Sequence, residues 1–402
     1  MTFRYKGGVI SATAPTITPP VAGEGGTASG VWTLEQQFQN AGNWPKPVIP
    51  RQLWSWGQNN TSQLGLGNSI NYSSPKQIGA LTTWLQVANS YHTIATKTDG
   101  TLWSWGYNAS GQLGIGNTVT CSSPVQVGAL TTWSQVATGK YHTIATKIDG
   151  TLWSWGYNTV GQLGLGDLVS RSSPVQVGAL TTWLQITAGE YHTMAIKTDG
   201  TLWGWGENVT YGQLGLGNIN NYNSPKQVGA LTTWYKISAG KSYTIATKID
   251  GTLWAWGFNV AGTLGLGNTS YYSSPKQVGA LTTWYEISAG GATTVATKTD
   301  GTLWSWGSNT RGQLGIGNIT NYSSPKQVGA LTTWYKISSI GGSIAAIKND
   351  GTLWSWGNNS SGELGLGNTT NYSSPKQIGA LITWKSLTKS FSLQTMLAIK
   401  TP

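Results

Sequence analysis

A five-residue signal, Leu-Trp-Ser-Trp-Gly and its close variants, recurs along this chain at a nearly constant interval and limits its possible folds more than any other feature. The copies advance by 49, 50, 50, 51, 50 and 50 residues, and they begin at Leu53, Leu102, Leu152, Leu202, Leu253, Leu303 and Leu353. A period of this length is typical of arrays whose units bury their faces against their neighbours. We therefore expect one repeat domain, residues 51–402, preceded by a leader, residues 1–50.

One period, taken as residues 81–130, contains four candidate strands bounded by turn residues: 84–88, 93–98, 101–105 and 124–127. Asp99-Gly100 lies between the second and third and is a strong signal for a tight hairpin. No stretch of the repeat has helical periodicity. Four short antiparallel strands repeated seven times can hide their faces and edges by radial stacking, which predicts an all-β, seven-bladed β-propeller.

The motif content of the repeat points to a known family. Trp103-Ser104-Trp105-Gly106, then Gly111-Gln112-Leu113-Gly114-Ile115-Gly116-Asn117, then Ser123-Pro124 resembles the repeat of the regulator of chromosome condensation family, whose members are seven-bladed propellers. The resemblance recurs over residues 53–402. The array begins on a third and fourth strand (53–56 and 75–78) and ends on a first and second (384–388 and 396–400), so we expect both chain ends to share the closing blade.

The 23 tryptophans suggest either sugar binding or architecture. Because 21 of them are three per repeat at equivalent positions, architecture is the favoured interpretation. Trp103 and Trp105 lie two residues apart on a strand, so their side chains point the same way and are expected to fill the space between blades. The Gly-Gln-Leu-Gly-Leu-Gly segments lack the helix and lysine of a nucleotide-binding loop, so we expect them to set loop geometry and predict no cofactor.

Composition argues against several partners. The net charge of +11 comes from basic residues spread around the repeats, many of them two positions before an aspartate, as in Lys97 and Asp99. Without a basic stripe, nucleic-acid binding is not expected. No apolar run approaches the length of a membrane span, so no membrane insertion is expected. The single cysteine, Cys121, has no internal partner for a disulfide.

Two places vary most between repeats: the turn between the first and second strands, and the loop after Trp-Gly. In an antiparallel meander these connections lie at the same end of each blade, so the variable positions should share one face of the disc. The opposite face should carry the near-identical Asp-Gly hairpins and Gly-Ala-Leu-Thr-Thr-Trp turns. The candidate binding residues are Tyr91, His92, Tyr107, Tyr141, His142, Tyr157, Tyr191, His192, Tyr243 and Phe258. Ordinary loop packing is the alternative interpretation of these residues.

The three histidines occupy one equivalent position in consecutive repeats. Three histidines can bind zinc, but equivalent atoms in adjacent blades are expected to lie about 10 Å or more apart, whereas zinc needs ligands at about 2 Å. We therefore predict no metal site. The family resemblance implies a role in packing and turn formation for a histidine at this position.

The leader has its own signals. Residues 11–31 are rich in Pro, Gly, Ala, Ser and Thr and suit an extended strap. Thr33 and Gln36 form a capping-box pattern that predicts a short helix, which Gly42 can close. The expected anchor residues are Val31, Trp32, Leu34, Phe38 and Trp44. The alternative is that the leader packs against its own domain.

Phrases of the leader, such as Gly7-Gly8-Val9-Ile10-Ser11 and the segment 28–36, resemble the starts of structural proteins of tailed bacteriophages. The resemblance implies a virion component whose leader docks on a neighbouring particle protein. The repeats themselves contain no unique catalytic constellation, so no enzyme is expected.

Together these features predict a non-enzymatic tail or fibre adhesin, exposed on the virion, whose leader binds other virion proteins and whose variable face binds a host receptor or glycan. A structural decoration or cement protein, and a cellular protein-interaction propeller, are the alternatives.

Overall fold

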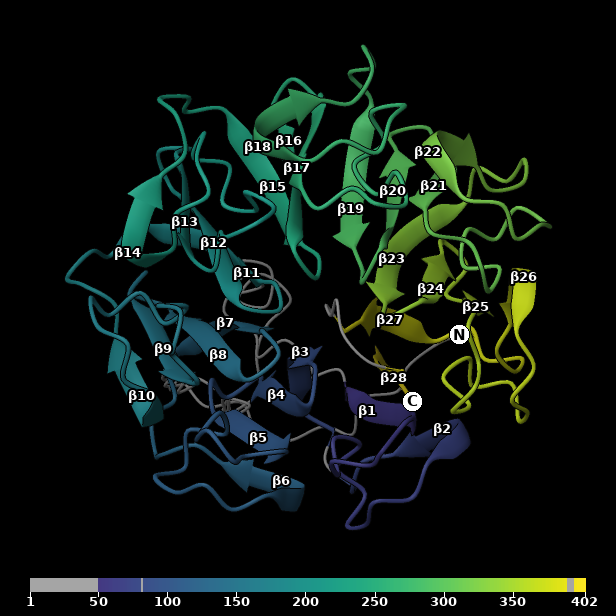
Figure 1. The fold of residues 1–402 in the computed structure, drawn as a ribbon. Helices are drawn as coiled ribbons and strands as arrows, with labels where there is room; N and C mark the ends of the chain where they lie inside the picture. The colour runs from purple at the N-terminus through teal and green to yellow at the C-terminus, as the bar shows by residue number, and fades with distance from the viewer. Residues whose placement is uncertain (1–49, 81, 389–393) are drawn as a thin grey trace, which may run out of the picture. The chain divides into compact units, whose positions relative to one another are not determined.

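The computed structural model describes residues 50–80, 82–388 and 394–402. This part of the chain contains strands and no helix, and the strands form seven four-stranded antiparallel sheets arranged as the blades of a propeller (Figure 1). The predicted all-β, seven-bladed architecture is confirmed. The predicted leader helix and the anchor residues Val31, Trp32, Leu34, Phe38 and Trp44 lie outside the described residues, so these interpretations of the leader stay predictions.

The blades are numbered around the ring, each from its innermost strand outward. Blade 1 contains β27 (Trp384–Leu387), β28 (Thr395–Lys400), β1 (Gln52–Gly57) and β2 (Tyr72–Gln77). Blade 2 contains β3 (Trp84–Asn89), β4 (His92–Lys97), β5 (Leu102–Gly106) and β6 (Cys121–Gln126). Blade 3 contains β7 (Trp133–Thr138), β8 (His142–Lys147), β9 (Leu152–Gly156) and β10 (Arg171–Gln176). Blade 4 contains β11 (Trp183–Ala188), β12 (His192–Lys197), β13 (Leu202–Gly206) and β14 (Tyr222–Gln227).

The remaining blades repeat this plan. Blade 5 contains β15 (Trp234–Ala239), β16 (Tyr243–Lys248), β17 (Leu253–Gly257) and β18 (Tyr272–Gln277). Blade 6 contains β19 (Trp284–Ala289), β20 (Thr293–Lys298), β21 (Leu303–Gly307) and β22 (Tyr322–Gln327). Blade 7 contains β23 (Trp334–Ile340), β24 (Ser343–Lys348), β25 (Leu353–Gly357) and β26 (Tyr372–Gln377).

Blade 1 closes the ring as predicted. Strand β1, from the start of the domain, pairs antiparallel with β28, from its end, with Leu53 opposite Ile399 and Trp56 opposite Met396. The closure joins segments more than 300 residues apart in sequence, so the ring is held shut by a full strand pairing.

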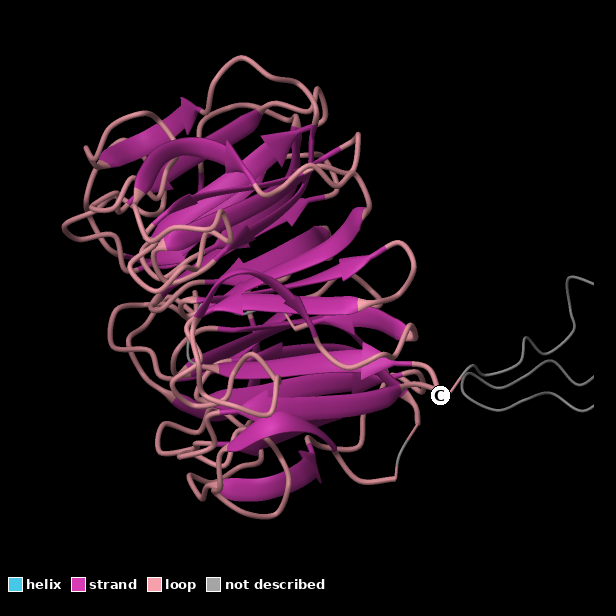
Figure 2. Ribbon diagram, turned by 90° about the vertical axis from the view of Figure 1, so that its right-hand side faces the viewer, coloured by secondary structure: helices cyan, strands magenta, loops and turns pink. Residues whose placement is uncertain are grey.

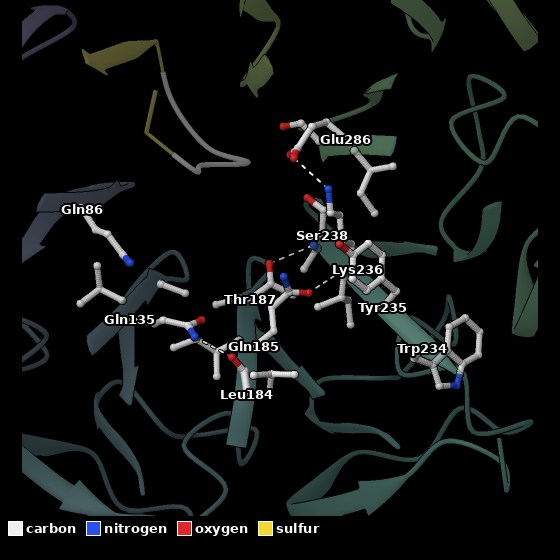
Figure 3. Close-up of a pocket in the computed structure, with 18 of the residues that line it drawn as sticks. Gln86, Gln135, Leu184, Gln185, Thr187, Trp234, Tyr235, Lys236, Ser238 and Glu286 are labelled. Carbon is white, nitrogen blue, oxygen red and sulfur yellow. Dashed lines mark hydrogen bonds and ion pairs between the residues drawn. The ribbon is translucent and has the colours of Figure 1, made fainter. Parts of the chain in front are cut away.

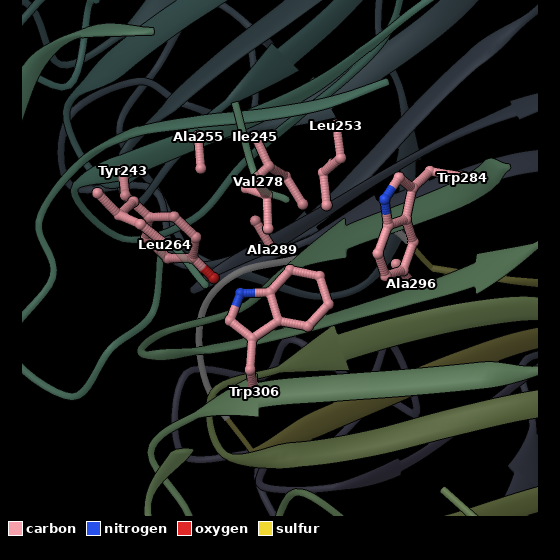
Figure 4. Packing of buried hydrophobic residues seen from close by; sticks show 10 residues of the cluster. All are labelled: Tyr243, Ile245, Leu253, Ala255, Leu264, Val278, Trp284, Ala289, Ala296 and Trp306. Carbon is pink, nitrogen blue, oxygen red and sulfur yellow. The ribbon is translucent and has the colours of Figure 1, made fainter. Parts of the chain in front are cut away.

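The core lies between blades and not within them. One cluster joins Ile245, Leu253 and Leu264 of blade 5 to Trp284 and Trp306 of blade 6 (Figure 4). The second tryptophan of every motif is fully buried, and an aromatic side chain of this kind buries roughly 150–250 Å². The architectural role predicted for the repeated tryptophans is confirmed.

The two motif tryptophans share a partner, as their spacing predicts. In blade 2 the rings of Trp103 and Trp105 lie 6.3 and 5.8 Å from the ring of Trp84, both edge-on. Trp105 is fully buried, whereas Trp103 is half-buried and carries the Lys97 ammonium 3.5 Å from its ring centroid. The Trp103 indole therefore lies at the edge of the core, and the Lys97 ammonium covers its face.

The glycine-rich loop of each repeat locks one blade to the next. The Gln112 carbonyl of blade 2 accepts hydrogen bonds from the Trp155 indole, at 2.9 Å, and from the Thr143 hydroxyl, at 2.8 Å, both in blade 3. Gly114 has a φ of +72°, and a Cβ there would lie 2.6 Å from the Trp155 indole nitrogen. This close approach explains why the segment needs glycine at this position, and it supports the interpretation that the Gly-Gln-Leu-Gly segment sets loop geometry.

The two ends of the strands form the two faces of the domain. In the side view of Figure 2 the strands cross the molecule and the connecting loops gather at its two sides. Antiparallel order places the first turn of each blade and its long third-to-fourth loop at one end, which we call the variable face. The Asp-Gly hairpins and the Gly-Ala-Leu-Thr-Thr-Trp turns lie at the other end, the constant face.

Candidate functional site: a tyrosine cluster on the variable face

Five half-buried tyrosines from three adjacent blades meet on the variable face. We call Tyr91, Tyr107, Tyr141, Tyr157 and Tyr191 the tyrosine cluster. Their ring centroids lie 5.2 Å apart for Tyr91 and Tyr141, 5.7 Å for Tyr107 and Tyr141, and 6.2 Å for Tyr157 and Tyr191. Five residues spread over 100 positions of sequence therefore form one contiguous aromatic surface.

Backbone hydrogen bonds fix the tyrosines in pairs within each blade. The Tyr107 amide donates to the Tyr91 carbonyl at 3.1 Å, and the Tyr157 amide donates to the Tyr141 carbonyl at 2.8 Å. These bonds tie the first turn of the blade to the residue after Trp-Gly. The cluster thus stands on a rigid base, although all of its members belong to turns or loops.

A cation lies at the centre of the cluster. The Lys140 ammonium is 5.3 Å from the ring centroid of Tyr141, 5.4 Å from that of Tyr191 and 5.9 Å from that of Tyr91. It forms an ion pair of 2.6 Å with Glu190 of the next blade. Burial disfavours the charge of Lys140, but the hydrogen bond and the charge of Glu190 outweigh burial and raise the Lys140 pKa.

Other charged groups surround this pair. The Lys241 ammonium lies 3.5 Å from the second Glu190 carboxylate oxygen and is well exposed. Burial is the main cause that raises the pKa of Glu207, and the nearby Glu190 charge is the second. The Glu207 amide donates to the Tyr191 carbonyl. Two lysines and two glutamates balance, so the cluster combines aromatic surface with polar groups and carries little net charge.

Phe258 belongs to a separate aromatic group. Its ring lies 5.1 Å from that of Tyr211 and 5.8 Å from that of Tyr271, in the loops of blades 4 and 5. The sequence interpretation did not select Tyr211 or Tyr271. A signal was present, because the 51-residue step of that repeat places an extra residue in the loop that holds Tyr211.

The structure removes four predicted residues from the binding surface. His92, His142, His192 and Tyr243 are fully buried, so their side chains do not present a surface to a partner. Each histidine Nε2 contacts a threonine hydroxyl of the next blade, at 2.7 Å for His92 and Thr143. Because the Thr143 hydroxyl donates to the Gln112 carbonyl, His92 is the donor in this contact. The sequence places these residues beside the turn but does not show that they point inward.

Burial also sets the protonation of the histidines. It lowers the pKa of His92, His142 and His192 from 6.5 to about 3, so all three are neutral at pH 7. In blade 5 the Tyr243 hydroxyl replaces the imidazole and contacts the Thr294 hydroxyl at 3.0 Å. The packing role implied by the family resemblance accounts for both residues.

Over residues 50–80, 82–388 and 394–402, no group of three or more His, Cys, Asp or Glu side chains is placed to hold a metal ion. Within the same part of the chain, no helix has the length and apolar character needed to cross a membrane.

Comparison with known families places the chain among propellers. The model described as the RCC1-like domain matches residues 52–284. Regulator of chromosome condensation (RCC1) repeats match residues 284–313, 300–344 and 350–387. The chain therefore belongs to the RCC1-like repeat family. No curated protein sequence matches the chain closely enough to count as a relative.

Solved structures share the fold at low identity. Yeast RCC1 (Prp20), solved bound to Kap60, is 19% identical with a TM-score of 0.77, over 88% of this chain and 89% of that chain. Human WBSCR16 is 19% identical with a TM-score of 0.78, over 87% of this chain and 99% of that chain. Saccharomyces cerevisiae Prp20p, described with its binding properties to Gsp1p and histones, is 20% identical with a TM-score of 0.76, over 88% and 92%. Identity at this level carries the fold alone.

Proposed function

We propose that this protein is a non-enzymatic adhesin of a bacteriophage particle, which binds a host-surface glycan through the tyrosine cluster. The observation that carries the glycan part is the grouping of five half-buried tyrosines around the Lys140–Glu190 pair. Tyrosine offers a flat apolar face and a polar tip, which suits a sugar ring with its hydroxyl groups. A largely apolar surface with a few fixed polar groups is typical of binding sites for small ligands.

The particle part of the proposal rests on the leader. Its resemblance to the starts of phage structural proteins supports docking of residues 1–50 on other virion proteins. The domain begins at the end of β1 that belongs to the constant face, since Arg51 bridges to Thr83 there. The domain therefore begins on the constant face, whereas the tyrosine cluster lies on the variable face.

The test is a glycan array combined with host-cell binding of the full chain. We expect Tyr107→Ala and Tyr157→Ala each to weaken glycan binding by roughly tenfold, as loss of a central aromatic contact does. Tyr322→Ala, on the outer strand of blade 6, is the matched control and should bind as the natural chain does. Binding that is unchanged in both cluster variants contradicts the assignment to this surface.

Two other functions keep specific support. A structural decoration or cement protein needs the same leader but no glycan, and its copy number would follow the capsid or tail lattice. A cellular protein-interaction propeller is favoured by family membership, because the similar yeast Prp20p is described with Gsp1p and histones. Localisation in purified particles separates the three: tips or appendages for an adhesin, the lattice for a cement protein, and no particle association for a cellular protein.

A further inference from the structure

The innermost strands enclose a channel that no function above uses. A cavity of about 910 Å³ lies along the propeller axis, lined by residues of all seven innermost strands. Asp199 and Gly200, of an Asp-Gly hairpin, also line it, so the cavity opens on the constant face. Figure 3 shows Gln86 and Gln135 on one side of this space and Lys236 and Glu286 on another.

A bulge at the start of every innermost strand aims two side chains at this opening. In blade 5, Trp234 pairs with Lys248 and Lys236 pairs with Thr247, which leaves Tyr235 as the extra residue. A bulge of this kind redirects side chains locally. The residue after the bulge lines the channel in all seven blades, and in blades 2 to 5 the bulged residue lines it too.

The residues after the bulge form a ring of unequal chemistry, which we call the channel ring. Its members, in blade order from blade 1, are Ser386, Gln86, Gln135, Gln185, Lys236, Glu286 and Lys336. Blades 2 to 4 contribute three neutral amides. Blades 5 to 7 contribute three charged groups, so the ring has an amide side and an ionic side.

The ionic side is positive. One Glu286 carboxylate oxygen lies 2.8 Å from the Lys236 ammonium and 3.6 Å from the Lys336 ammonium, so one carboxylate faces two lysines. The remaining charged lining residues, Lys197 and Asp199, offset each other. Lys385, at the bulge position of β27 next to Ser386 of the channel ring, is exposed and adds a further positive charge.

The mouth beside these lysines is apolar. The bulged residues Leu184, Tyr235, Tyr285 and Tyr335 are 51%, 54%, 42% and 45% exposed, and we call them the apolar crescent. The Lys236 ammonium lies 4.0 Å from the ring centroid of Tyr285, so crescent and ring are in contact. Leu184 and Tyr235 of the crescent line the cavity itself. A contiguous group of exposed apolar side chains often marks an interaction site.

We propose that this channel mouth binds an extended, acidic polypeptide segment of a partner protein, with apolar side chains on the crescent and a carboxylate at Lys336 and Lys385. Gln135 already donates its amide to the Leu184 carbonyl, and Gln185 accepts from the Ile237 amide. Their remaining groups, the Gln135 oxygen and the Gln185 amide, can still accept from and donate to a peptide backbone. The amide side of the ring thus contacts the backbone of the bound segment, and the ionic side contacts its carboxylate. The site lies on the face opposite the tyrosine cluster, so this inference is independent of the glycan proposal.

The test uses the full chain and a fluorescein-labelled octapeptide of alternating glutamate and leucine, followed by fluorescence anisotropy. We expect the paired change Lys336→Glu and Lys385→Glu to weaken binding by at least about tenfold, because it reverses the charge that faces the ligand. The matched control, Lys226→Glu with Lys276→Glu, makes the same charge change on the exposed outer strands β14 and β18. It should stay within about twofold of the natural chain at the same salt concentration.

A second variant tests the crescent. Tyr235→Ser removes an exposed ring without opening the core, and we expect about fivefold weaker binding. Thermal melting followed by tryptophan fluorescence checks that every variant is folded. Failure of the octapeptide to bind, equal binding of its lysine–leucine counterpart, or equal effects of the two lysine pairs would overturn the proposal. Citrate that binds as tightly as the octapeptide would overturn it too, since the site would then serve small anions.

Discussion

Blades 2 to 4 and blades 5 to 7 share one scaffold but carry tyrosines at opposite ends of the innermost strand. In blades 2 to 4 the tyrosines lie on the variable face, as Tyr91, Tyr141 and Tyr191. In blades 5 to 7 they lie on the constant face, at the bulge that begins the innermost strand, as Tyr235, Tyr285 and Tyr335. The contrast teaches that the core between blades stays constant from repeat to repeat. The repeats differ at positions whose side chains reach one of the two faces or the channel.

The two sets of blades, which we call the two sectors, also differ at a buried position, the first residue of the second strand. Blades 2 to 4 begin their second strand with a histidine, whereas blades 5, 6 and 7 begin it with Tyr243, Thr293 and Ser343. All six residues are buried, so this position is a second place where the sectors differ without a change of fold.

The largest effect should come from the shared scaffold. Gly114→Ala places a Cβ 2.6 Å from the Trp155 indole nitrogen, and Gly315→Ala places one 2.5 Å from that of Trp356. We expect each to lower the free energy of unfolding by about 3 kcal/mol or more, from the clash together with the positive φ. Chemical denaturation followed by tryptophan fluorescence measures both.

The chain offers matched controls for this pair. Gly128 and Gly329 have φ values of +61° and +62° with nothing within 4 Å of an added Cβ. Their alanine variants should lose only about 1 kcal/mol, the cost of the backbone conformation. A large difference in unfolding free energy between Gly114→Ala and Gly315→Ala would contradict the idea that both sectors use the same packing between blades.

The next effect should belong to blades 2 to 4 alone, and it depends on pH. Their histidines have a folded pKa of about 3 against an ordinary value of 6.5. Above pH 6.5 the imidazoles are neutral in both states. As pH falls below that value the unfolded chain binds protons that the folded chain does not, so the free energy of unfolding decreases, by roughly 1.4 kcal/mol per pH unit for each histidine.

His142→Gln tests this linkage. Between pH ~6 and ~4.5 we expect the loss of stability with falling pH to be smaller by about one proton than in the natural chain. The window avoids the hairpin aspartates, such as Asp149, whose pKa is held below 3.8 by hydrogen bonds from Thr151. An unchanged slope in His142→Gln would show that the imidazole gains protons in the folded state.

The smallest effect should come from the ion pair at the centre of the tyrosine cluster. Lys140→Met leaves the mostly buried Glu190 with the more distant Lys241, and we expect a loss of about 1–2 kcal/mol in the free energy of unfolding. Arg171→Met breaks the more exposed Arg171–Asp167 pair and should cost less than about 0.5 kcal/mol. Equal losses of unfolding free energy in Lys140→Met and Arg171→Met would show that the buried Lys140–Glu190 pair stabilises the fold no more than an exposed pair does.

Much of the fold was predictable from the sequence, and the site was predictable only in part. The Trp-Gly spacing located the strands to within a few residues, as for the first strand of blade 2, predicted at 84–88 and observed at Trp84–Asn89. Alternation also predicted the shared direction of Trp103 and Trp105. It did not predict the burial of His92, because the turn before it changes the direction of the chain and no periodicity crosses a turn.

The repeat itself determined the blade number, the shared closing blade and the division into two faces, because a unit of this size can bury its strands only against copies of itself. Only the tertiary structure decided which variable residues meet. Tyr91 and Tyr141 lie 50 positions apart, yet their rings are 5.2 Å apart because blades 2 and 3 pack side by side and bring equivalent turns together. It also decided that Lys236, Glu286 and Lys336 meet in the channel, since one extra residue at the start of each innermost strand turns the following side chain toward it.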